Sequence, residues 1–78
     1  MKTTRYFEYV KKRSDRAFIR NEWIEFVIAN PAKIAVQSDG RLRKWAKIPE
    51  VNKYLRVILL ADGETVHNAF FDRSFREE

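Results

Sequence analysis

The apolar residues in the first third of the chain repeat at helical spacing. The stretch NEWIEFVIANP, residues 21–31, places four large apolar side chains on one helical face, namely Trp23, Ile24, Val27 and Ile28. Asn21 is a favourable N-cap residue, and Asn30 followed by a proline ends the pattern. These signals predict a helix whose apolar face packs on the rest of the domain.

The sequence of residues 4–13 fits both helical and strand periodicity. Tyr6, Phe7 and Val10 suit the stripe of a helix, whereas Arg5, Phe7 and Tyr9 also alternate as in a strand. We favour a short helix here, with a strand as the open alternative.

Beyond residue 32 the pattern indicates β-strands. KIAVQ and RLRKWAKI flank Ser38–Gly40, while KYLRVILLA and TVHNAFF flank Asp62–Gly63, a dipeptide suited to a tight hairpin turn. Pro49–Asn52 makes the remaining short connection. We therefore expect an α+β domain, with two N-terminal helices packed on one face of a three- to four-stranded antiparallel β-meander. The other face of such a sheet can be open to solvent.

Regular strand pairing would separate the side chains into two faces. We assume that the Asp-Gly turn has two loop residues and that Ile48 opposes Lys53, so that alternate residues share a face. The predicted core face contains Leu55, Val57, Leu59, Val66, Asn68 and Phe70. The predicted open face contains Arg41, Arg43, Trp45, Lys47, Tyr54, Arg56, His67 and Phe71. Lys44 then falls on the core side and Ile34 and Val36 on the open side, which a bulge or an edge strand would explain.

The composition limits the chemistry. A chain of 78 residues predicts a single domain over residues 1–78. The absence of Cys and the single His argue against disulfides and against thiolate or histidine zinc sites, and two Gly cannot build a phosphate-binding loop. We expect no metal and no small-molecule cofactor. The sequence has no apolar stretch long enough for a membrane span and no signal-peptide core, so we expect a cytoplasmic protein without membrane contact.

The positive charge is concentrated in the middle of the chain. The formal net charge is +5, and residues 33–56 alone hold seven Lys or Arg against two Asp or Glu. Such a patch attracts nucleic-acid backbones or an acidic protein segment, and charge does not choose between them.

Four stretches in order, EWIEFVIANP, QSDGRLRKW, YLRVILLADG and VHNAFFDR, resemble the RelE/ParE superfamily of small toxins, especially its BrnT-like members. The match lies in the layout of residues 21–73: a helix ending in Asn-Pro, a DGR-type turn, a central strand with an embedded Arg, and a last strand running into Asp-Arg. The superfamily includes ribosome-dependent messenger-RNA nucleases and gyrase inhibitors. The resemblance implies a RelE-like fold and a toxin of toxin–antitoxin type that acts on RNA or the ribosome and is neutralised by a small acidic antitoxin.

For a nuclease, the resemblance implies a metal-independent endoribonuclease. His67 would be the acid or base, Arg56 and Arg43 would hold phosphate oxygens, and Arg73 would be a further active residue. The RNA-binding residues would be Arg41, Trp45, Lys47 and Tyr54.

Three of these residues also have a structural interpretation. Arg56 would pair with an acid such as Glu64 or Asp72, His67 would be a tolerated polar residue, and Trp45 would pack across strands. The alternative function is then a non-catalytic protein-interaction module that receives an acidic helix or an extended segment on the same face or at an exposed strand edge.

Overall fold

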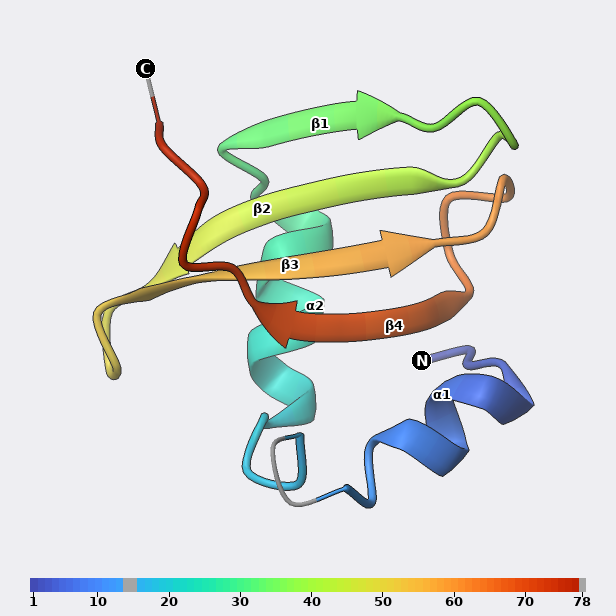
Figure 1. The fold of residues 1–78 in the computed structure, drawn as a ribbon, viewed down its shortest axis with the longest axis horizontal. Helices are drawn as coiled ribbons and strands as arrows, with labels where there is room; N and C mark the ends of the chain where they lie inside the picture. Colours follow the sequence, from blue (N-terminus) through green and yellow to red (C-terminus); the bar gives the residue numbers. More distant parts are fainter. Residues whose placement is uncertain (14–15, 78) are drawn as a thin grey trace.

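A computed structural model describes residues 1–13 and 16–77 as a four-stranded sheet with two helices (Figure 1). The elements are α1 (Arg5–Val10), α2 (Asn21–Ala29), β1 (Lys33–Val36), β2 (Leu42–Ile48), β3 (Lys53–Leu59) and β4 (Val66–Phe71). The strands form an antiparallel meander in the order β1-β2-β3-β4. The predicted α+β class is confirmed, and residues 5–10 are a helix. Within the described ranges no helix is long and apolar enough to cross a membrane.

The two helices occupy different positions on the sheet. Figure 1 shows α2 crossing behind the strands, where it packs on β2 and β3, whereas α1 lies beside the outer strand β4. Trp23, Ile24 and Val27 of α2 are buried, as their helical spacing predicted. Phe7 and Val10 of α1 are buried in the same hydrophobic core. Both helices therefore share one core, but only α2 lies across the sheet.

The helix ends differ from the prediction in one respect. The N-cap residue of α2 is Arg20, whose side chain makes no capping hydrogen bond, so the assignment of Asn21 as the cap was wrong. Asn21 is instead the first helical residue, because the chain enters the helix one residue earlier. At the other end, Lys44 Nζ donates to the carbonyl of Ile28 at 3.0 Å. This bond explains how a lysine is accommodated on the core side of the sheet.

The β3–β4 turn is longer than a two-residue hairpin. Leu60 N donates to Thr65 O at 2.9 Å, and Gly63 N donates to Leu60 O at 2.9 Å, which makes a four-residue loop. Within this loop only Gly63 has a positive φ, +72°. Hydrogen bonds from the hydroxyl and amide of Thr65 and from the amide of Glu64 lower the pKa of Asp62 to about 2. The two-residue loop was therefore a wrong assumption, although Leu59 still pairs with Val66.

The pairing of β2 with β3 is as predicted, but that of β3 with β4 contains a bulge. Ile58 pairs with Asn68 while the preceding pair is Leu59 with Val66, so His67 is an extra residue in β4. Beyond the bulge every β4 residue is shifted by one position relative to the predicted pairing, so that Arg56 opposes Phe70. Because side chains alternate, this shift exchanges the two faces of β4.

The bulge corrects the predicted core. Asn68 and Phe70 were wrongly placed on the core face, and Phe71 was wrongly placed on the open face. Phe71 instead packs beside the helix side of the sheet, with its ring 6.2 Å from that of Trp23 and 6.0 Å from that of Phe18. The buried core contains Phe7, Val10, Trp23, Ile24, Val27, Ala46, Ile48, Leu55, Val57, Leu59, Val66 and Ala69.

Strand β1 extends past the helical cover. Ile34 pairs with Lys44 and Val36 with Leu42, so both side chains lie on the helix side and not on the open side as predicted. They nevertheless remain 53% and 70% exposed. The reason is that α2 packs on β2 and β3 and leaves the outer strand uncovered.

Candidate functional site

The sheet face opposite α2 carries a row of alternating cations and aromatic rings. Successive strands pair Lys33 with Trp45, Trp45 with Arg56, and Arg56 with Phe70. The Arg56 guanidinium lies 5.4 Å from the ring centre of Trp45 and 4.9 Å from that of Phe70. Arg16 lies 5.3 Å from the same Phe70 ring. Four strand residues therefore cross the whole sheet, and we call them the basic–aromatic row: Lys33, Trp45, Arg56 and Phe70.

Two further cations flank the row on β2. Arg43 and Lys47 stand on either side of Trp45, and pair with Ile58 and Tyr54 of β3. Among the described residues, no ion pair joins a carboxylate to Arg43, Lys47 or the row's lysine. The Nε atom of Arg43 is buried and has no hydrogen-bond partner in the described part of the chain. Lys33 and Lys47 are exposed, so their positive charge is available to an external anion, whereas the buried Nε of Arg43 is not accessible.

Asp72 lies against the middle of the basic–aromatic row and accepts hydrogen bonds from two of its members. Its Oδ2 accepts hydrogen bonds from Trp45 Nε1 at 2.9 Å and from Arg56 Nε and Nη2 at 3.1 and 2.7 Å. Burial disfavours its ionised form, but hydrogen bonds from Trp45, Ser74 and Arg56 outweigh burial and lower the pKa of Asp72. The interpretation that Arg56 pairs with an acid is confirmed for Asp72. An external phosphate would reach Arg56 by displacing this carboxylate.

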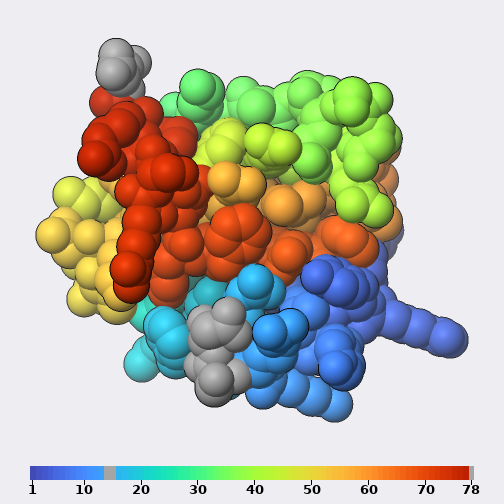
Figure 2. All heavy atoms as spheres, in the orientation of Figure 1, coloured from blue at the N-terminus to red at the C-terminus, as the bar shows by residue number. Residues whose placement is uncertain are grey.

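Residues 72–77, the C-terminal segment, cover the two middle members of the row, Trp45 and Arg56. Figure 2 looks onto this face and shows the segment, in red, crossing the strands. The Phe75 ring stacks on Trp45 with centroids 5.1 Å apart, and its centroid is 4.9 Å from that of Tyr54. Tyr54 Oη donates to Glu77 at 2.6 Å, which raises the pKa of the phenol. Trp45 is consequently only 6% exposed, so the middle of the row is not open to solvent as predicted.

His67 lies near the N-terminus of the chain and not beside Arg56. Its Nδ1 is 3.1 Å from Thr4 Oγ1, and its ring stacks on Tyr6 at a centroid distance of 4.9 Å. Burial, and then the positive charge of Arg41, lower the pKa of His67, with Asp39 opposing. The imidazole is therefore predominantly neutral at neutral pH.

The predicted site residues thus occupy separate positions. Trp45, Tyr54 and Arg56 gather around Asp72 and Phe75, with Arg43 and Lys47 next to them on β2. Arg41 pairs with Asp39 at 3.6 Å in the β1–β2 turn, and its charge acts on His67. Arg73 is exposed where the C-terminal segment begins. The structure brings the aromatic residues and the cations of β2 and β3 onto one face of the sheet, whereas no described contact joins the four residues proposed for catalysis in one cluster.

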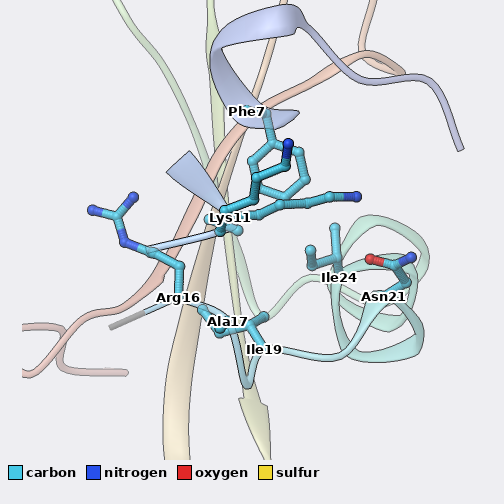
Figure 3. Close-up of a pocket in the computed structure, with 9 residues that line it drawn as sticks. Phe7, Lys11, Arg16, Ala17, Ile19, Asn21 and Ile24 are labelled. Atoms are coloured by element: carbon cyan, nitrogen blue, oxygen red, sulfur yellow. The ribbon is translucent and has the colours of Figure 1, made fainter. Parts of the chain in front are cut away.

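A cavity of about 230 Å³ lies away from this face, between α1 and the start of α2 (Figure 3). Phe7, Ile19 and Ile24 form its apolar wall, and the stems of Lys11 and Arg16 line its mouth. This volume is below the range of roughly 300–1,000 Å³ typical of ligand pockets. Within residues 1–13 and 16–77 no three His, Cys, Asp or Glu side chains gather to hold a metal ion. A larger pocket, of about 460 Å³, lies between the C-terminal segment and the start of β3, and Tyr54, Asp72 and Phe75 are among the residues that line it. The candidate site is accordingly the sheet face together with this segment.

No protein-family model, curated protein or solved structure matches this chain. The class of protein is accordingly defined by its own geometry: a small α+β domain with two helices and a four-stranded antiparallel sheet. The RelE/ParE resemblance stays a prediction.

Proposed function

We propose that this protein is a toxin-like RNA-binding protein, which binds single-stranded RNA on the sheet face opposite α2. The supporting observation is the basic–aromatic row, with Arg43 and Lys47 beside it. Proteins that bind single strands use aromatic rings as stacking platforms and nearby cations for the phosphates. Phe70 supplies a ring that the C-terminal segment does not stack on, and Lys33 supplies an exposed cation at the far end of the row.

Single-stranded RNA fits this surface better than duplex DNA. Reading a major groove requires a helix or a two-stranded ribbon that projects from the domain. The longer helix, α2, is buried on its apolar side and presents Glu22 and Glu25 to solvent, which would repel phosphates. The flat sheet instead offers rings and cations at strand spacing, to which unstacked bases and their phosphates can bind.

Binding is favoured over cleavage as the activity. Cleavage would need an acid or base beside the residues that hold the phosphate. No described hydrogen bond, ion pair or ring contact joins His67 to Arg43, Arg56 or Arg73. Growth arrest would then follow from occupation of messenger RNA and not from its hydrolysis.

Fluorescence anisotropy with a short labelled oligoribonucleotide tests the proposal. We expect the Arg43→Gln/Lys47→Gln variant to bind at least about tenfold more weakly, and its salt slope to fall by about 0.7 for each phosphate that is no longer neutralised. Lys11→Gln/Lys12→Gln, just after α1, removes the same charge away from the face and is the matched control. Equal weakening by both variants, or no binding by the wild type, would contradict the assigned surface.

Inducible expression in a bacterial host tests the toxin-like part. We expect the wild type to slow growth while transcripts stay intact, and the Arg43→Gln/Lys47→Gln variant to restore growth at equal expression. Cut transcripts would show cleavage and overturn the preference for binding. Unimpaired growth with the wild type would remove the toxin role while leaving RNA binding to the anisotropy experiment.

A further inference from the structure

The two outer strands of the sheet are covered differently. On the outer side of β4, Val66 N donates to Lys2 O at 2.8 Å and Thr4 N donates to Val66 O at 3.0 Å. Helix α1 packs against the same strand. On the outer side of β1, the described part of the chain provides no neighbouring strand. The backbone groups on that side therefore have no strand partner within the described protomer.

The ladder between β1 and β2 identifies these groups. Gln37 N donates to Arg41 O at 2.7 Å, which marks a hydrogen-bonded pair at the end of the hairpin. Because such pairs alternate along an antiparallel ladder, Ala35 and Lys33 point their backbone groups toward β2. The N–H and C=O groups of Ile34 and Val36 consequently point outward. Each protomer offers two donors and two acceptors along this edge.

The side chains of β1 make this edge suitable for pairing. Ile34 and Val36 are exposed, β-branched and on the same face of the sheet. Proteins usually protect an edge strand with a central charge, a proline or a bulge. The centre of β1 has none of these, and its one charged residue, Lys33, is at its start.

We propose that β1 pairs antiparallel with β1 of a second copy, about a two-fold axis at Ala35. In this register Ile34 opposes Val36 of the partner subunit, and all four outward groups of each protomer form hydrogen bonds. Lys33 opposes the uncharged Gln37 of the partner subunit, so no like charges face each other. An isologous pairing therefore satisfies polar, apolar and charged groups together.

The symmetry has a consequence for both faces. A two-fold axis between antiparallel strands is perpendicular to the sheet, so both α2 helices lie on one side and both basic–aromatic rows on the other. The dimer would have one continuous sheet of eight strands. Ile34 and Val36 of the two copies would form an apolar cluster between the helices. The observation is independent of RNA binding, and the dimer stands if the proposed function fails.

Sedimentation equilibrium of the full chain over a range of concentrations tests this inference. We expect the wild type to move from 9.4 kDa toward twice that mass as concentration rises. Ile34→Lys/Val36→Lys places lysines opposite lysines across the axis and should raise the dissociation constant about tenfold or more. Ile34→Glu/Val36→Lys places opposite charges together in the same register and should retain the dimer. Circular dichroism checks that each variant is folded.

Tyr9→Lys/Phe26→Lys also introduces two lysines, at exposed apolar residues away from β1, and should leave the dissociation constant unchanged. A wild type that stays monomeric at every concentration would overturn the proposal and leave the edge to a different chain. Dimers that persist in Ile34→Lys/Val36→Lys would place the interface elsewhere. Loss of the dimer in Ile34→Glu/Val36→Lys would overturn the register.

Discussion

At the scale of single residues, Asp72 links Trp45 and Arg56 on the sheet face opposite α2. One carboxylate, of which only 7% of the side chain is exposed, accepts hydrogen bonds from an indole, a guanidinium and a serine. This carboxylate neutralises Arg56, the charged residue that interrupts the apolar sequence of β3. Without it, Arg56 would be a partly buried, unpaired cation.

Replacing Asp72 by Asn should therefore destabilise the protein and change its response to acid. We expect the free energy of unfolding at neutral pH to fall by about 2 kcal/mol, because the charged acceptor is removed. The pKa of Asp72 is lower in the folded state than its ordinary value of 3.8, so its contribution is present above that value and disappears as the pH falls through and below it. Urea unfolding at neutral and acidic pH measures both effects.

Asp62→Asn is the comparison for this experiment. Asp62 has a pKa of about 2 and also loses its contribution as the pH falls, but it is an exposed turn residue. We expect Asp62→Asn to make the free energy of unfolding less dependent on acidic pH. Its decrease of stability at neutral pH should be smaller than that of Asp72→Asn. If Asp72→Asn keeps the full acid slope of the wild type, the carboxylate does not act as described.

The sequence predicts some of these side-chain interactions and not others. An embedded Arg in an apolar strand calls for an acidic partner, and Asp72 was one of two named acids. The stacking of Phe75 on Trp45 had no comparable signal. Residues after 72 show neither helical nor strand periodicity, so nothing local indicates that they return across the sheet.

At the scale of elements, the helices and strands follow from periodicity, but the register of β4 does not. A bulge adds one residue and leaves the composition of the strand unchanged. One local signal was available in TVHNAFF: the adjacent polar residues His67 and Asn68 separate the core residues Val66 and Ala69 by three positions instead of two. That spacing is typical of a bulge and accounts for the exchanged faces.

Helix α1 depends on its N-cap. Thr4 Oγ1 accepts a hydrogen bond from Phe7 N at 3.1 Å and lies beside the His67 ring. We expect Thr4→Ala to lower the free energy of unfolding by about 1 kcal/mol, because an N-terminal amide of the helix is left without its partner. Thermal unfolding followed by circular dichroism measures the decrease. Thr4→Ser keeps the hydroxyl and should recover most of the stability, and equal destabilisation by both variants would contradict the capping role.

At the scale of the whole molecule, the two faces of the sheet are covered unequally. The α2 side contains the hydrophobic core, while the other side is covered in part by the C-terminal segment. Trp45 is buried by that segment and not by the core. The burial of one tryptophan therefore reports on the position of residues 72–77.

Phe75→Ala should expose Trp45 without unfolding the domain. We expect tryptophan emission to shift to longer wavelength and iodide quenching to increase, and the protein to be destabilised by about 1–2 kcal/mol because no ring packs on the indole. Phe18→Ala removes a ring of the same size that stacks on Phe71 and not on Trp45, and should leave the emission unchanged. Both variants are made in a Trp23→Phe background, so that Trp45 is the single tryptophan. Unchanged quenching in Phe75→Ala would show that other groups bury the indole.

The parallel bridge between Thr3 and Val66 has a consequence for synthesis on the ribosome. The first residues of the chain find their strand partner near its end, and α1 packs against β4. A helix of six residues is marginal on its own. Because translation proceeds from the N-terminus, Phe7 and Val10 cannot make their contacts with β4 until residues 66–71 have emerged. Residues 2–10 therefore complete their native contacts only after the last strand of this domain has been synthesised.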